Sequence, residues 1–148
     1  MSKAFCPRGT QLQRGTNPDA PTGYTTLAEV RKITRTGAKS GFDNVTNMDS
    51  GNTEEMLPTI LTPGTWDFEV NFVPGDATQQ TLLDDYNNQV LSPWKVLLPP
   101  GGTFVTSYGS WTFLAYVESE DASLDFSKAA TKSVKLQVTG PVTWTPGS

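Results

Sequence analysis

Clustered carboxylates are the residues of this sequence that most resemble a catalytic site. They occur together at Glu54-Glu55, at Asp84-Asp85 and at Glu118, Glu120 and Asp121. Glycoside hydrolysis uses two carboxylates held a fixed distance apart. However, adjacent residues of a strand point to opposite faces of a sheet, and the helical pattern around Asp84-Asp85 predicts that this pair lies on an exposed helix side. We therefore predict solvated charges and no enzyme.

The remaining residue types exclude most other site chemistry. The sequence has no histidine and a single cysteine, Cys6, which excludes histidine triads and cysteine-cluster zinc sites. Oxygen ligands gather at Asp43, Asn47 and Asp49, but their spacing misses the pattern of a calcium-binding loop. Segment 37–40 lacks the glycine that directly precedes the lysine of a phosphate loop. The sequence predicts no catalytic, cofactor or metal site.

Composition narrows the class of protein. The chain has 148 residues and a formal net charge of −4, with a pI of about 4.7. Such an acidic chain is a poor ligand for nucleic acid or anionic lipid, because phosphate binding needs a surplus of Lys and Arg. No apolar stretch has the length of a signal peptide or a membrane span. We expect a single domain over residues 1–148 that folds in a reducing cytosol.

Alternating apolar residues predict a mainly β fold. The clearest strand covers residues 65–72, where polar residues alternate with Trp66, Phe68, Val70 and Phe72. Further strands are expected at 94–98, 103–118 and 133–139, with a bulged strand at 24–35 and another near Leu124 and Phe126. The polar segment 1–23 is expected to be an extended N-terminal arm. We predict an antiparallel β-sandwich or barrel with one flanking α-helix and a long loop or hairpin.

The flanking helix is expected over residues 76–90. Asp76 and Gln79 form a capping-box-like pair at its start, and an apolar stripe follows at Leu82, Leu83, Tyr86 and Val90. The stripe predicts that Leu82, Tyr86 and Val90 pack against the sheet that contains Trp66 and Phe68.

The segment 36–63 is a long polar connection with too many apolar residues for a passive linker. These residues are Phe42, Val45, Met48, Met56, Leu57, Ile60 and Leu61. A structureless stretch of this length is uncommon inside a compact domain. We predict a loop or hairpin that buries these apolar side chains against a surface outside the segment; one alternative is a loop folded back on its own domain, with solvated charges.

Charge is distributed unevenly around this segment. The basic residues are Arg31, Lys32, Arg35 and Lys39, and the acidic residues that follow are Asp43, Asp49, Glu54 and Glu55. The two ends of the segment therefore carry opposite charge, which suits contact with a surface of complementary charge.

The tryptophans keep a binding module open as an alternative, because exposed aromatic rings on a β-sandwich can stack against sugars. Trp66 and Trp94 share the register of apolar neighbours and are predicted to lie in the core. Trp144, near the chain end, is the tryptophan expected to be exposed.

Several motifs follow one another in a distinctive order along nearly the whole chain. Gly9-Thr10-Gln11-Leu12 precedes the strand with Leu27, Val30 and Ile33. The loop 42–50 and the strand 66–72 come next, and Pro74-Gly75-Asp76 leads into the helix with Gln80 and Leu82-Leu83. The final motif is 138–144. In this order, the sequence resembles the major tail tube proteins of long-tailed, sheathless (lambda-like) bacteriophages.

The resemblance implies a structural virion protein that self-assembles into stacked hexameric rings, forming the tail tube through which the genome enters the host. It implies no cofactor. The implied partners are other copies of the chain, the tape-measure protein, the tail terminator and tail-tip proteins, with no membrane and no specific DNA binding. The protein is expected in the host cytoplasm before assembly and in the virion tail afterwards.

Two sets of residues follow as candidates for assembly and for the channel. The inter-ring assembly loop is assigned to Lys39, Phe42, Asp43, Met48, Asp49, Glu54, Glu55, Met56 and Leu57. An acidic lining repels phosphate and lets DNA slide, so the candidates for the channel wall are Asp67, Glu69, Glu118 and Glu120. Two alternative functions stay open: a carbohydrate-binding β-sandwich module, and the tube protein of a contractile tail or secretion apparatus.

Overall fold

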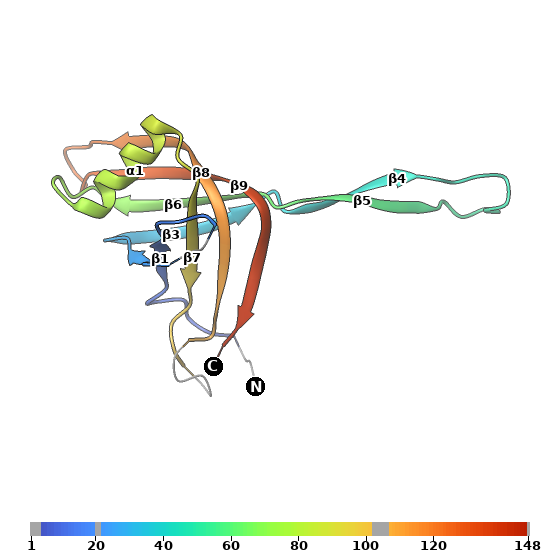
Figure 1. The fold of residues 1–148 in the computed structure, drawn as a ribbon, viewed down its shortest axis with the longest axis horizontal. Coiled ribbons are helices and arrows are strands. Elements are labelled where there is room, and N and C mark those ends of the chain that lie inside the picture. The colour runs from blue at the N-terminus through green and yellow to red at the C-terminus, as the bar shows by residue number, and fades with distance from the viewer. Residues whose placement is uncertain (1–3, 20–21, 102–106, 148) are drawn as a thin grey trace.

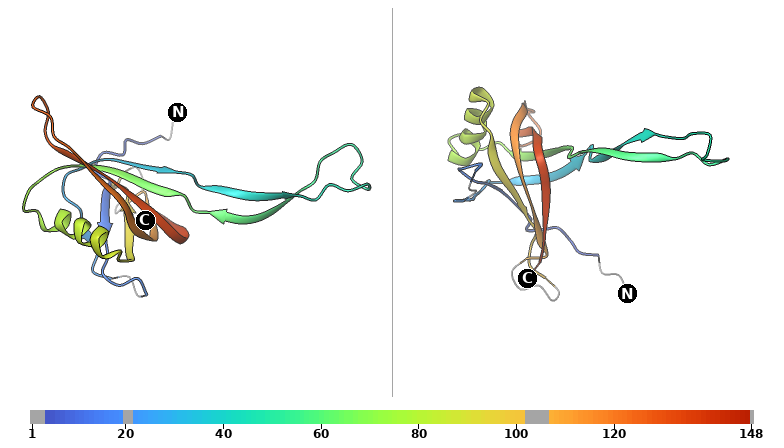
Figure 2. Two further views of the ribbon diagram at one scale, coloured as in Figure 1. Left: turned by 90° about the horizontal axis from the view of Figure 1, so that it is seen from above. Right: turned by 45° about the vertical axis from the view of Figure 1, so that its right-hand side comes forward.

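An antiparallel sheet forms the body of the molecule, and a separate hairpin projects from it (Figures 1 and 2). The computed structural model describes residues 4–19, 22–101 and 107–147. The sheet has seven strands in the order β2-β1-β7-β8-β9-β6-β3, and the hairpin is β4-β5. The fold class predicted from the sequence, mostly antiparallel β with one helix, is confirmed.

The elements have the following bounds. The sheet contains β1 (Gln11–Arg14), β2 (Thr25–Thr26), β3 (Val30–Thr36), β6 (Thr65–Asn71), β7 (Ser92–Leu97), β8 (Gly109–Ser123) and β9 (Thr131–Pro146). The hairpin contains β4 (Lys39–Asn44) and β5 (Met56–Thr62), and the helix α1 spans Ala77–Asn88.

Two long strands curl the sheet around its core. β8 pairs with β7 through its first half and with β9 along its length, while the first half of β9 pairs with β6. The ladder between β8 and β9 shifts register between Thr112 and Leu114 and again between Val117 and Ser119. Bulges increase the local bend of a strand, and Figure 1 shows both strands curving from the layer under α1 into the β7 region.

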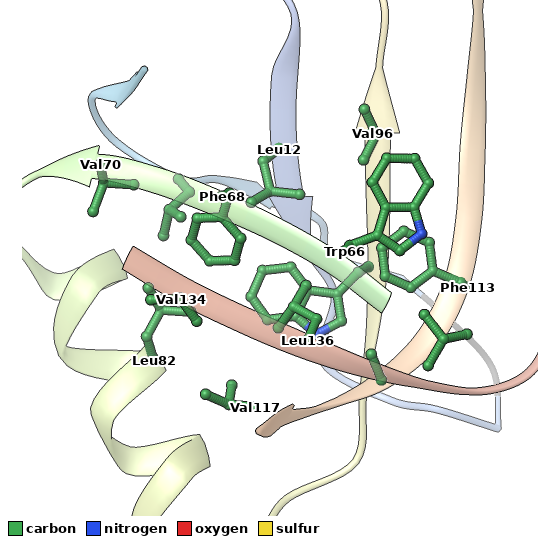
Figure 3. Packing of buried hydrophobic residues seen from close by; sticks show 14 residues of the cluster. Leu12, Trp66, Phe68, Val70, Leu82, Val96, Phe113, Val117, Val134 and Leu136 are labelled. Atoms are coloured by element: carbon green, nitrogen blue, oxygen red, sulfur yellow. The ribbon is translucent and has the colours of Figure 1, made fainter. Parts of the chain in front are cut away.

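The core lies on the sheet face that α1 covers. Along β6, Trp66, Phe68 and Val70 are at most 4% exposed, whereas the residues between them are half-buried. Trp94 of β7 is fully buried, which confirms the prediction for both tryptophans. The rings of Trp66 and Phe113 stack with centroids 5.2 Å apart, and Leu82 of α1 lies beside Val134 of β9 (Figure 3).

The start of α1 agrees with the predicted N-cap but not with the capping box. The Asp76 carboxylate accepts hydrogen bonds from the backbone N–H groups of Thr78 and Gln79. Gln79 does not reach back to the cap. Its buried amide donates to the Asn71 carbonyl at 2.8 Å and accepts from the Val73 N–H at 3.0 Å, so it ties the helix to the end of β6.

The prediction that Leu82, Tyr86 and Val90 pack against the sheet is correct for Leu82 and wrong for Tyr86 and Val90. Leu82 is 1% exposed, but Tyr86 and Val90 are 45% and 40% exposed. Gln79 and Asp85 are the other buried residues of the helix. The helix therefore packs against the body through positions 79, 82 and 85. Asp85 can be buried there because a cation from β1 pairs with its carboxylate.

That cation is Arg14. Its Nε and Nη2 donate to the two carboxylate oxygens of Asp85 at 2.6 and 2.8 Å, and Nη2 also donates to the Ser92 hydroxyl at 2.9 Å. A bidentate pair of this kind is among the stronger side-chain contacts. The expectation that Asp84-Asp85 lies on the exposed side of the helix is correct for Asp84 and wrong for Asp85.

Three predicted segments differ in secondary structure. The N-terminal segment is not a free arm throughout, because β1 pairs with β7 and places Leu12 in the core at 1% exposure. The expected strand near Leu124 and Phe126 is instead a turn after β8, with both side chains exposed. The expected strand 24–35 is divided into β2 and β3, and its bulge lies between Val30 and Lys32.

Candidate assembly surface

The hairpin β4-β5 extends the β3-β6 pair beyond the body as a two-stranded arm (Figure 2). The body ladder ends at the Thr36–Thr65 pair, and the arm ladder begins at Lys39–Thr62. Gly37 and Gly64, with φ angles of 77° and 85°, form the junction. A Cβ atom on Gly64 would lie 2.3 Å from the Thr36 carbonyl oxygen, so the crossing requires glycine. At roughly 3.3 Å per residue, the arm reaches about 35 Å.

Large apolar side chains cover this arm and remain exposed. The exposed fractions are 58% for Phe42, 101% for Met48, 50% for Met56, 53% for Leu57, 75% for Ile60 and 76% for Leu61. Within the described residues, β4 and β5 pack extensively only against each other. An apolar surface of this extent on a projecting element indicates a binding surface.

The register of the hairpin gathers three of these side chains on one face. Phe42 is opposite Pro58, Asn44 is opposite Met56, and Ser40 is opposite Leu61. Residues opposite each other across a ladder share a face, and alternate residues of β4 do so as well. Phe42, Met56 and Leu61 therefore form one apolar face, which we call the arm face.

Two of the four acidic side chains of the arm, Glu54 and Glu55, accept local hydrogen bonds. Asn44 donates to Glu54 at 2.8 Å, and the Ser50 hydroxyl donates to Glu55 at 2.8 Å. Among the residues that the structure describes, Asp43, Asp49, Glu54 and Glu55 form no ion pair. The arm thus combines an apolar face with uncompensated negative charge, and it contains all nine residues of the predicted assembly loop.

Ile60 and Leu61 were not among the predicted assembly residues, although they are the most exposed apolar residues of β5. Their signal in the sequence was the apolar run that ends the segment 36–63. The observed β4-β5 pairing places this run on the arm.

The four acidic candidates for the channel wall do not share one face. Asp67 and Glu69 lie on the sheet face opposite the core, together with Lys32 and Lys135. Arg31 donates to Glu69 at 3.5 Å. This face therefore carries both signs of charge.

The other two candidates are affected by a bulge in β8. Glu118 is the extra residue between Val117 and Ser119 and is exposed. The bulge shifts the alternation, so Glu120 lies opposite Val134 on the core side. There it accepts a hydrogen bond of 2.6 Å from Lys132 Nζ, with its side chain only 9% exposed. Because of the extra residue in the bulge, Glu120 lies on the opposite sheet face from Asp67 and Glu69.

Other kinds of site receive little support from the geometry. In the parts of the chain that the structure describes, no group of three or more Cys, Asp or Glu side chains could hold a metal ion. Over the same residues, no helix is long and apolar enough to cross a bilayer. Trp144 is 44% exposed, as predicted, but its ring packs against Trp111 with centroids 4.6 Å apart.

Comparison with known protein families identifies the kind of protein to which the arm belongs. The family model for the lambda phage tail tube protein matches residues 9–145. The chain belongs to this family. It is a tail tube protein, a structural component of the phage virion located in the tail, and the resemblance stated from the sequence is confirmed. The search of curated proteins gave no match.

Solved structures share the fold at low sequence identity. The tail tube of phage SPP1 is 18% identical with a TM-score of 0.69, covering 93% of this chain and 76% of that one. The tail of a gene transfer agent, computed with C6 symmetry, is 13% identical with a TM-score of 0.73, covering 96% and 99%. The baseplate structure of the anti-feeding prophage has 10% identity and a TM-score of 0.74, covering 99% and 98%.

These likenesses show a fold shared with two tails and with the anti-feeding prophage baseplate structure. The tail tube family match favours a tube protein over the carbohydrate-binding alternative, and it assigns the chain to the lambda type among tube proteins.

Proposed function

We propose that six copies of this tail tube protein close into a ring, and that rings stack because the arm of each subunit packs against the next ring. The observation that carries the proposal is the arm itself, whose seven large apolar side chains are at least 40% exposed. The C6 symmetry of the gene transfer agent tail supports the ring size. Each Leu, Phe or Met that becomes fully buried adds about 1.5–3 kcal/mol.

The nine residues of the assembly loop act in two ways in this proposal. Phe42, Met48, Met56 and Leu57 supply apolar contact area. The charged residues Lys39, Asp43, Asp49, Glu54 and Glu55 fix register and partner choice, since charge complementarity contributes more to specificity than to affinity.

The stacked rings enclose a channel through which DNA passes without specific binding. Asp67, Glu69 and Glu118 are the proposed acidic part of its wall, whereas Glu120 is neutralised by Lys132. The tape-measure protein, the tail terminator and the tail-tip proteins are the proposed partners of the tube, and host cytoplasm is the proposed location before assembly. The role is structural, without catalysis.

Electron microscopy and hydrogen exchange test this function together. Negative-stain images of the purified protein should show rings or tubes. Amide hydrogens of residues 39–62 should exchange rapidly in the monomer and slowly in the tube, because their burial partner is another subunit. Equal protection in both states would refute the stacking role, and a compact monomer that binds glycans would support the carbohydrate-binding alternative.

Genome exit tests the channel wall. A triple variant with Asp67→Lys, Glu69→Lys and Glu118→Lys should still form tubes but slow DNA ejection, because each new cation adds a phosphate contact. Normal infectivity of an assembling triple variant would contradict the proposed lining.

A further inference from the structure

An apolar groove of about 660 Å³ opens on the body between the N-terminal segment, β3 and β7. Its apolar wall consists of Val30, Ile33, Trp66, Val96, Leu98 and Trp111. Trp66 and Val96 belong to the buried core, while Ile33 and Trp111 pack against that core and remain partly exposed. The groove is thus a place where the core of the body reaches the surface.

Basic side chains surround the apolar wall. Arg8, Arg31, Lys32 and Arg35 line the groove. Arg35 donates to the Pro63 carbonyl at 2.9 Å and lies 5.7 Å from the centroid of the Trp66 ring. Arg31 is paired with Glu69, but Arg8 and Lys32 form no ion pair among the described residues. The rim is therefore positively charged and only partly compensated.

The groove is also bounded by an open strand edge. β3 is the last strand of the seven-stranded sheet, and residues 30–33 and 35 of this strand line the groove. An edge strand leaves backbone N–H and C=O groups that pair with an added strand. An extended, apolar and acidic segment matches the groove in shape, polarity and charge.

The arm of a second copy has these three properties. It is a two-stranded ribbon with free edges, its arm face is apolar, and its acids Asp43, Asp49, Glu54 and Glu55 are unpaired within the described chain. The arm extends away from its own body in every view of Figures 1 and 2, so it does not fill its own groove.

We propose that the groove of one copy receives the arm of a second copy. This inference rests on the proposed stacking function and names the surface to which the arm binds. Phe42, Met56 and Leu61 pack against the apolar wall. Asp49 and Glu54 of the arm lie near Arg8 and Lys32, which gain the ion-pair partners they lack within their own chain.

Charge reversal with rescue tests the pairing. Arg8→Glu with Lys32→Glu alters the groove, and Asp49→Lys with Glu54→Lys alters the arm; all four positions are exposed. We expect each double variant to slow tube elongation at least tenfold. The chain with all four substitutions should recover most of the wild-type rate, because the opposite charges meet again. Lys128→Glu with Lys135→Glu, which makes the same charge change outside the groove, serves as the control and should elongate normally.

The outcomes separate this inference from the stacking function. If the arm variant fails while the groove variant elongates normally, the arm stacks elsewhere and the groove assignment is overturned. If both variants keep wild-type melting temperatures and the four-fold variant is not rescued, the charge pairing is overturned. If the wild-type chain forms no tubes, the proposed function itself fails.

A cross-link through the single cysteine gives independent geometry. Cys6 is exposed and lies between Phe5 and Pro7, which both line the groove. In assembled Met56→Cys protein, a short bismaleimide should join chains into dimers and longer ladders on a denaturing gel. Removing Cys6 by Cys6→Ala should abolish the ladder, and Ser127→Cys at the β8–β9 turn should give none. A ladder from Ser127→Cys but not from Met56→Cys would overturn the docking site.

Discussion

Two consecutive strands of equal length show how differently the arm and the body use apolar residues. β5 and β6 each have seven residues and are separated only by Pro63 and Gly64. Every residue of β5 is exposed, whereas β6 buries alternate side chains. β6 pairs with β3 and β9 and contributes to the core, while β5 pairs with β4 alone.

The difference teaches that apolar content does not by itself identify a core strand. The body buries most of its apolar side chains within its own chain. The arm leaves its apolar side chains exposed. An isolated two-stranded ribbon is only marginally stable in water, and in the proposed tube another subunit covers it. Substitutions in the body should therefore change folding stability, and substitutions in the arm should change assembly.

The largest expected effect comes from removing the arm. Deleting residues 38–63 joins Gly37 to Gly64 between the paired residues Thr36 and Thr65. Both glycines already have positive φ, so they suit a two-residue type I′ turn. We expect a folded body with a melting temperature near that of the wild type and complete loss of tubes in electron micrographs. Tubes formed by this variant, or an unfolded body, would break the proposed division of roles.

A matched pair of leucines compares the two regions directly. Leu82→Ala removes a fully buried side chain and should lower the free energy of unfolding by about 2–5 kcal/mol. Leu61→Ala removes a side chain that is 76% exposed and should change it by less than about 0.5 kcal/mol, while slowing elongation. Denaturant unfolding of the two monomers measures both values. Similar destabilisation by the two substitutions would show that the arm packs on its own body.

Two aspartates extend the comparison to charged residues. Asp85→Ala removes the partner of Arg14 and should cost about 2 kcal/mol, because it leaves hydrogen bonds of a charged group unmade. Asp43→Ala, on the exposed arm, should change monomer stability by less than about 0.5 kcal/mol. Asp84→Ala, the exposed neighbour of Asp85, is the control in the body. In thermal melts, the melting temperature of Asp85→Ala should be well below those of the other two variants.

The smallest effect is confined to acid pH. The Thr78 hydroxyl, which donates to the Asp76 carboxylate, holds the pKa of Asp76 below its ordinary value. Desolvation opposes this shift, and the Thr78 and Gln79 amides lower the pKa further. A depressed pKa in the folded state adds stability above the ordinary value of about 4, and this stability is lost as the pH falls through the folded pKa.

Asp76→Asn should therefore lower stability at neutral pH and flatten its loss in acid. Melting temperatures between about pH 7 and pH 2 for both proteins measure the difference. Parallel curves for wild type and variant would show that Asp76 contributes nothing to the acid sensitivity of the body.

Local sequence patterns were sufficient to predict several elements of the fold. The alternation at 65–72 predicted β6 to within one residue, Asp76 predicted the start of α1, and the apolar register of Trp66 and Trp94 placed both in the core. Each of these signals depends on residues close together in the chain. The same holds for the segment 36–63, whose mixture of apolar and acidic residues predicted a loop or hairpin without a partner in its own domain.

The sequence alone therefore determined the mainly β fold, the single helix and the position of the projecting segment, because alternation, capping and composition act over a few neighbouring residues. Only the tertiary structure decided which side of α1 is buried, since Arg14, distant in sequence, pairs with Asp85. It also decided the face of Glu120, because the bulge at Glu118 reverses the alternation of β8. Strand pairing between distant residues sets these outcomes, and no local pattern encodes the register of that pairing.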